Sequence, residues 1–286
     1  MGATYSEDSE AFRLVNNISM EFLTNMVSLQ SDLLGRLKSR PGLRLLLRCF
    51  NVSVGKVIGT ITHFSTIQPV VALTFDDGPH PVDTPLLLDL LERYQAKVTF
   101  FMIGKSAEKY PQIVSRTVAA GHAIGNHSWD HPSFSLISGR ERRTQIRACA
   151  TAIAPHGLPL FRPPYAHQNI ISRLEAWQLG HEVIGWNLAA ADWRGYSATQ
   201  IYNRLKNGLH PGSIVLLHDT LNTASEIQYA SREPMLEAVD RLLDQFKDRF
   251  HFVTIPDMFQ YGDAERRLWF RKANSNSLNR LIKVGK

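Results

Sequence analysis

The stretch that decides the fold is residues 70–80, VVALTFDDGPH. Its first half is an uninterrupted apolar and β-branched run that ends at Phe75, and such a run predicts a short buried strand. The carboxylates of Asp76 and Asp77 follow at once, and a Gly-Pro pair then turns the chain. The segment therefore predicts a strand that delivers two acidic side chains at its carboxyl end.

Runs of the same kind recur along the chain and are separated by longer helical stretches. We predict seven strands, at residues 70–75, 97–101, 122–126, 159–162, 181–187, 213–217 and 251–255. We predict helices at residues 85–95, 111–120, 140–154, 168–179, 198–207 and 234–246. Alternating strands and helices are typical of repeated βα units around a parallel sheet. The expected fold is therefore α/β, a distorted (β/α)7 barrel with an N-terminal helical extension.

Length and composition fit one catalytic domain with extensions. The 286 residues are 44% apolar and 20% charged, as in soluble proteins with a sizeable core, and the chain is short for two enzymatic domains. We expect a helical basic extension at 1–66, a catalytic domain at 67–260 and a basic tail at 261–286 that frays, with residues 268–270 docking on the body. The two cysteines, Cys49 and Cys149, exclude a disulfide framework, and we interpret both as small core residues.

The N-terminal extension is basic and amphipathic. Its apolar residues recur at steps of three and four, which predicts a helix over about 9–37; they are Val15, Ile18, Phe22, Met26, Leu29 and Leu33. No acidic residue lies between Asp32 and Asp76, whereas Arg and Lys recur there. Two interpretations stay open: a solvated cationic face whose apolar side packs on the barrel, or a peripheral membrane contact through residues 9–60.

Charge and targeting signals set the expected partners and location. The net charge of +6 is a mild excess that gives little support to a nucleic-acid partner, so we expect none. The first residues carry no basic cluster followed by an apolar core of the kind found in secretory signals. The expected location is cytoplasmic, at the inner face of the membrane if the second interpretation holds.

Polar side chains able to do chemistry follow five of the predicted strands. They are Asp76 with Asp77, His127 with His131, Arg162, Asp192 with Trp193, and His218. The carboxyl ends of all strands in a parallel barrel open on one face, so residues far apart in the chain can converge there. Taken singly, each has a structural alternative: a polar turn for the two aspartates, a satisfied core side chain for His218 and a surface side chain for Arg162.

His127 and His131 stand four residues apart, which predicts that one helical turn presents both imidazoles on the same side. A lone pair of this spacing is more often structural than metal-binding. Joined to one carboxylate, the pair gives three nitrogen and oxygen ligands and leaves a coordination position open for water or substrate. This set predicts a catalytic divalent metal; zinc suits it, and Fe(II) or another divalent ion competes for the same ligands.

The five segments, in this order, resemble those of the polysaccharide deacetylases over about residues 67–258. This family, also described by NodB homology and as carbohydrate esterase family 4, includes rhizobial chitooligosaccharide deacetylases, chitin deacetylases and peptidoglycan N-acetylglucosamine deacetylases. The resemblance implies that Asp76 is the catalytic base, held by Arg162, and that the metal ligands are Asp77, His127 and His131. It implies that the backbone N–H of Tyr165 binds the oxyanion and that Asp192 tunes His218, the general acid. It also implies that Trp193 and Leu216 line the pocket for the acetyl methyl group.

The resemblance implies a metal-dependent hydrolase that removes N-acetyl groups from N-acetylglucosamine-type sugars of an oligosaccharide, polysaccharide or lipid-linked glycan, releasing acetate. The chain departs from the family pattern at Ala166 and Asn187, where Gly and Asp are common, and we expect Asn187 to change substrate contacts. One alternative is a catalytically inactive carbohydrate-binding barrel. A second, a non-haem iron oxygenase, has no use for the additional base, arginine and histidine.

Overall fold

The computed structural model describes residue 55 and residues 59–284. The predicted amphipathic helix at 9–37, Cys49 and nearly all of the segment 9–60 assigned to a membrane contact lie outside the described residues. Among the described helices, none combines the length and the apolarity needed to cross a bilayer.

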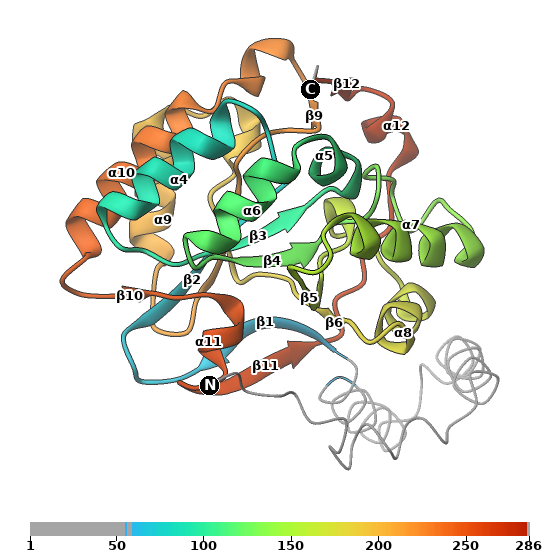
Figure 1. Ribbon diagram of the computed structural model, residues 1–286, viewed down its shortest axis with the longest axis horizontal. Coiled ribbons are helices and arrows are strands. Elements are labelled where there is room, and N and C mark those ends of the chain that lie inside the picture. Colours follow the sequence, from blue (N-terminus) through green and yellow to red (C-terminus); the bar gives the residue numbers. More distant parts are fainter. Residues whose placement is uncertain (1–54, 56–58, 285–286) are drawn as a thin grey trace, which may run out of the picture. The chain divides into compact units, whose positions relative to one another are not determined.

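A curled parallel sheet forms a half-barrel at the centre of the described part (Figure 1). Its strands are β2 (Val70–Asp76), β3 (Thr99–Met102), β4 (Ala123–Asn126), β5 (Gly157–Phe161), β6 (Glu182–Val183), β7 (Leu188–Ala189), β8 (Ile214–His218) and β10 (His251–Phe252). The order is β6-β5-β4-β3-β2-β8-β7, and β10 pairs with the first residues of β2. Every one of the seven predicted runs contributes a strand, which confirms the expected α/β fold.

Helices cover the outer face of the sheet. The longer ones are α4 (Asp83–Arg93), α6 (Pro111–Ala119), α7 (Gly139–Ala152), α8 (Ile170–Gln178), α9 (Ala198–Gly208) and α10 (Glu233–Phe246), close to the six predicted ranges. Figure 1 shows α4, α9 and α10 grouped together, and α10 contacts both α4 and α9. Ser138 and Ser197 begin α7 and α9 with capping boxes, which satisfy the free N–H groups of the first turn.

The side chains of β2 point alternately to the two faces of the sheet, one packed against the helices and the other facing the inside of the half-barrel. Val71, Leu73 and Phe75 belong to the apolar cluster shared with the covering helices. Val70 and Ala72 belong to a second cluster inside the half-barrel. Because side chains alternate along a strand, Thr74 and Asp76 lie on this inner side too, at the carboxyl end. The strand thus places one carboxylate inside the barrel mouth.

The chain after residue 254 folds back along the barrel. It forms α11 (Ile255–Met258), β11 (Asp263–Arg267), α12 (Ser275–Leu278) and β12 (Ile282–Lys283). Strand β11 pairs antiparallel with β1 (Thr60–Ser65), and β12 pairs antiparallel with β9 (Thr223–Ala224). The ring of Trp269 packs edge-on against Trp186, with centroids 4.7 Å apart, as docking of residues 268–270 predicts. The tail was expected to fray, but in its described part, up to residue 284, β11 and β12 each pair with a strand.

Candidate functional site

The turn after β2 holds the two adjacent aspartates in different directions. Asp77 has a positive φ of 78°, and a Cβ atom on Gly78 would overlap the carboxylate of Asp219. That buried carboxylate accepts the N–H of Gly78 at 3.1 Å and the hydroxyl of Thr84 at 2.5 Å. Asp219, which the sequence analysis did not single out, therefore fixes the turn that carries Asp77.

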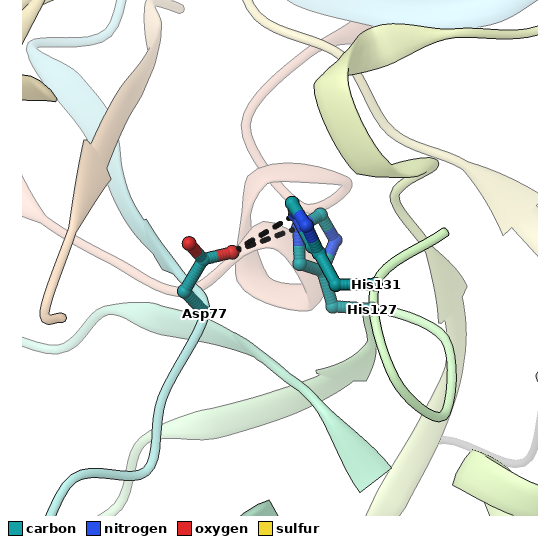
Figure 2. A group of neighbouring side chains, drawn as sticks. All are labelled: Asp77, His127 and His131. Atoms are coloured by element: carbon teal, nitrogen blue, oxygen red, sulfur yellow. Dashed lines mark ion pairs between the residues drawn. The ribbon is translucent and has the colours of Figure 1, made fainter. Parts of the chain in front are cut away.

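Asp77, His127 and His131 form one buried cluster (Figure 2). The Oδ1 atom of Asp77 lies 3.1 Å from Nε2 of His131 and 3.4 Å from Nε2 of His127. The predicted helical turn is wrong: the histidines lie in a loop, with positive φ at Ser128 (69°) and at His131 (66°). The loop nevertheless turns both imidazoles toward the same carboxylate, as the spacing predicted.

Hydrogen bonds to neighbouring backbone groups orient the side chains of His127 and Asp77 as metal ligands. Nδ1 of His127 lies 2.7 Å from the carbonyl oxygen of Arg162, so this nitrogen carries the proton and Nε2 keeps a free lone pair. The backbone N–H of Asn222 donates to Oδ2 of Asp77 at 2.8 Å. Burial raises the pKa of Asp77, but the neighbouring imidazoles of His131 and His127 outweigh burial and hold the pKa well below its usual value.

The donor set fits a divalent metal. One carboxylate oxygen and two imidazole nitrogens lie within 4.8 Å of one another. Two histidines and one carboxylate are a common set in catalytic sites, where a further position stays open for water or substrate. Asp77, His127 and His131 can therefore hold one divalent ion.

Asp76 lies beside this cluster and is held by a different partner. Nη1 of Arg162 donates to Oδ1 of Asp76 at 2.6 Å and to the hydroxyl of Thr74 at 2.7 Å. The arginine is fully buried, and its other nitrogens donate to the carbonyl oxygens of Ile184 and Gly185. Oδ2 of Asp76 lies 3.8 Å from Nε2 of His127. One oxygen of Asp76 is thus held by Arg162, while the other faces the cluster of metal-binding side chains.

His218 flanks the cluster from the neighbouring strand, since it stands opposite Asp76 in the β2–β8 register. Oδ1 of Asp192 lies 3.2 Å from Nδ1 of His218, and Oδ2 accepts the backbone N–H of His218 at 3.0 Å. Burial lowers the pKa of His218, but the charge and hydrogen bond of Asp192, with Asp77 and Asp76, outweigh burial and raise the pKa to about 9. The imidazole is therefore protonated at neutral pH.

Arg232 supports Asp192 from the other side and was missed by sequence reasoning. Its Nη1 donates to Oδ2 of Asp192 at 3.1 Å, and its remaining donors reach the carbonyl oxygens of Tyr229 and Ala230. Both members of this pair are almost fully buried. A single arginine in a polar loop before a helix carries no signal that would have identified it.

The cluster opens into a pocket of about 340 Å³. Eight residues predicted for the site line it: Asp76, Asp77, His127, His131, Tyr165, Trp193, Leu216 and His218. Arg162 and Asp192 lie behind Asp76 and His218, respectively. Asn187 contacts His210 and the backbone N–H of Ile214, so the expected change in substrate contacts finds no support in its position. The pocket also has lining residues that the sequence analysis did not select, among them Trp186, His167, Arg194 and Arg271.

The loop that carries Tyr165 has an unusual backbone. It forms η1 (Pro164–Ala166), in which Tyr165 and Ala166 both have positive φ, at 57° and 55°. Glycine adopts this region without strain, so the glycine common at the position of Ala166 suits the same loop conformation. Ala166 keeps that conformation here, and the ring of Tyr165 packs against His131 with centroids 4.5 Å apart.

Comparison with known proteins identifies the family. A family model described as polysaccharide deacetylase matches residues 64–184. A peptidoglycan N-acetylglucosamine deacetylase of Bacillus cereus is 36% identical over 196 residues, which cover 66% of this chain and 68% of that enzyme. A chitooligosaccharide deacetylase of Azorhizobium caulinodans is 35% identical over 167 residues, covering 57% of this chain and 80% of that enzyme.

A solved structure agrees with these relatives. The crystal structure of the Bc1960 peptidoglycan N-acetylglucosamine deacetylase, in complex with an N-oxidanyl-benzamide, is 32% identical and superposes with a TM-score of 0.67, covering 75% of this chain and 99% of that one. The fold, the cluster and the relatives agree with the resemblance seen in the sequence. The chain therefore belongs to the polysaccharide deacetylase family.

Proposed function

We propose that this chain hydrolyses the N-acetyl group of an N-acetylglucosamine-type sugar within an oligosaccharide or polysaccharide. The observation that supports it most directly is the arrangement of three groups in one pocket. Asp76 and His218 stand opposite each other on neighbouring strands, and the cluster of Asp77, His127 and His131 lies beside them. A base, an acid and a metal-binding set are the groups that amide hydrolysis needs.

We assign zinc to the cluster, because imidazole nitrogens combined with a carboxylate oxygen suit it. A divalent ion bound there would polarise the acetamide carbonyl and lower the pKa of the attacking water. The orientation of His127 by the Arg162 carbonyl supports this assignment, since ligating histidines usually donate their second nitrogen to such a partner.

The residues of the chain supply the proton transfers. Asp76, oriented by Arg162, accepts a proton from the water as the water oxygen attacks the carbonyl carbon. The N–H of Tyr165 forms no hydrogen bond within the described residues, and we assign it to the developing oxyanion. His218 then donates its proton to the amine as the C–N bond breaks. Acetate and a free amino sugar result.

The test is acetate release from N-acetylchitotetraose by zinc-loaded protein. We expect Asp76→Asn and His218→Ala to retain zinc, measured by elemental analysis, and to lose about 10²- to 10⁴-fold in kcat. The matched control is Asp89→Asn, because Asp89 is an exposed carboxylate on α4 that pairs with Arg116. Removal of the metal with a chelator should abolish turnover, and added zinc should restore it.

Two results would contradict the proposal. Unchanged turnover in Asp76→Asn or His218→Ala would remove these residues from the reaction. Binding of the oligosaccharide by the zinc-loaded wild type without release of acetate would favour a catalytically inactive carbohydrate-binding barrel.

A further inference from the structure

One side of the pocket is built by a segment outside the residues that the family model matches. Residues 271–284, called here the C-terminal wall, follow β11 and include α12 and β12. Four of its residues line the pocket: Arg271, Ser277, Leu278 and Leu281. Figure 1 shows α12 and β12 beside the loop that carries β9.

The C-terminal wall is attached to the loops that carry the site. The backbone of Arg271 exchanges two hydrogen bonds with Gln168, at 2.9 and 3.1 Å, close to Tyr165 in the chain. The N–H of Val284 donates to the carbonyl oxygen of Asn222 at 3.2 Å, and Asn222 in turn donates to Asp77. These hydrogen bonds hold the C-terminal wall in a defined position at one side of the pocket.

The wall brings a positive charge to the pocket. Arg271 is exposed and lines the pocket, and Arg194 of η2 (Asp192–Arg194) lines it as well. His167 lines the same pocket as these two arginines. Neither guanidinium forms a side-chain hydrogen bond or an ion pair with any residue in the described part of the chain.

The acidic groups of the pocket are already engaged. Among residues 59–284, Asp76 and Asp77 are the only carboxylates that line it. Asp76 contacts Arg162, and Asp77 contacts the histidines. A divalent ion beside them would offset their charge. Two unpaired guanidinium groups would then leave the rest of the pocket positive, and guanidinium groups bind carboxylate and phosphate through paired N–H donors.

We propose that the C-terminal wall is a subsite for an anionic group, a carboxylate or a phosphate, carried next to the N-acetyl sugar that is deacetylated. Arg271 binds the anion, and Leu278 and Leu281 contact the apolar face of the sugar that carries it. This inference rests on the proposed function, because it places the anion relative to the scissile acetamide.

Three substrates and two variants test the subsite. N-acetylchitotetraose is neutral; a tetrasaccharide of alternating N-acetylglucosamine and N-acetylmuramic acid adds a carboxylate to the same backbone; UDP-N-acetylglucosamine carries phosphates. The test variant is Arg271→Gln, with Arg271→Lys as the conservative replacement. The matched control is Arg280→Gln, because Arg280 is exposed in the same wall and does not line the pocket.

We expect the wild type to favour one of the anionic substrates over N-acetylchitotetraose, with a preference that falls as salt is added. In Arg271→Gln the ratio of kcat/KM for that substrate to kcat/KM for N-acetylchitotetraose should fall about tenfold, through KM, as loss of a charged hydrogen bond to an anion predicts. Arg271→Lys should recover part of this ratio, and Arg280→Gln should keep it.

An unchanged kcat/KM ratio in Arg271→Gln for both anionic substrates would overturn the inference. Equal kcat/KM values of the wild type for the anionic and the neutral substrates would overturn it too. Failure of the proposed function gives a different result, namely no acetate from any substrate. In that case, binding of the three saccharides to the Asp76→Asn variant and to Asp76→Asn with Arg271→Gln, measured by calorimetry, still decides whether Arg271 selects the anion.

Discussion

At the scale of single residues, Asp192 determines how His218 titrates. Its carboxylate is buried between His218 and Arg232 and contacts both. Burial alone would lower the pKa of His218, and Asp192 is the first of the groups that raise it to about 9. A cation bound at Asp77 would offset the contributions of the two other carboxylates, so the effect of Asp192 is the one that persists in the loaded enzyme.

Replacement of Asp192 by Asn should therefore move the pH profile. A general acid works while protonated, so activity is kept below its pKa and lost as the pH rises through it. In Asp192→Asn the descending limb of kcat against pH, measured with N-acetylchitotetraose, should lie at lower pH than in the wild type. A limb at the same pH in both proteins would mean that Asp192 does not set the titration of the acid.

Removal of Arg232 should cost folding stability, because it leaves the buried Asp192 carboxylate with only one of its two partners. Loss of one member of a buried pair typically costs about 3–5 kcal/mol. We expect Arg232→Met to lower the free energy of unfolding in urea by about 3 kcal/mol. The control, Arg147→Met, replaces an exposed arginine on α7 and should stay within about 0.5 kcal/mol of the wild type. Equal losses in both would contradict this account.

The residues that could be predicted from the sequence are those that end a strand or directly follow one. Asp76, Arg162 and His218 stand at positions where hydrophobic runs end, and the convergence of parallel strands then brings them together. Arg232 and Asp219 could not be found in this way. Their roles depend on contacts with residues far away in the sequence, Asp192 and Gly78, and no local sequence pattern predicts such contacts.

At the scale of elements, the turn after β2 depends on the absence of a side chain at Gly78. We expect Gly78→Ala to displace this turn, because the new methyl group would overlap the Asp219 carboxylate. Asp77 would move with it, so zinc affinity and deacetylase activity should both fall. Elemental analysis after dialysis against a fixed free-zinc buffer measures the first, and acetate release the second.

Gly180→Ala is the matched control for this turn. Gly180 has a positive φ of 78°, and nothing lies within 4 Å of a Cβ atom built there. The replacement should cost about 1 kcal/mol of backbone strain and leave zinc affinity intact. Equal zinc loss in both variants would show that general destabilisation, rather than the Asp219 contact, explains the effect.

The loop with the two histidines shows what spacing alone can predict. An interval of four residues predicted imidazoles on one side, and they do face one carboxylate. The backbone is nevertheless a loop in which Oδ1 of Asn126 accepts the N–H of Ser128 and Oγ of Ser128 accepts the N–H of His131. Side-chain bonds of this kind compete with a helical turn, and the spacing of the histidines alone does not show which of the two forms.

At the scale of the whole molecule, metal binding should add to stability, because the three ligands come from two separate loops that only the folded barrel brings together. A ligand that binds the folded state alone adds about 2.7 kcal/mol at a free concentration of 100 times its Kd. We expect zinc to raise the Tm of the wild type and to leave that of His131→Ala nearly unchanged, as measured by calorimetry. An equal rise in both would place the bound zinc elsewhere.

The arrangement of the barrel was predictable because buried strands and amphipathic helices repeat with clear periods along the chain. The C-terminal wall was not predictable. Its sequence is rich in polar and basic residues, and it is held largely by backbone hydrogen bonds to Gln168, Asn222 and strand β9. Such bonds do not depend on the type of side chain, so composition suggested a tail that frays.

The pairing of β2 with β8 has a consequence for biosynthesis. The bonded residues Thr74 and Val215 are 141 positions apart, so a nascent chain presents one edge of β2 without a neighbour until β8 has left the ribosome. An unpaired edge of a buried strand is prone to aggregate. Recombinant yield should therefore respond to chaperone supply and to slower translation at low temperature, and chains that end before β8 should collect in inclusion bodies.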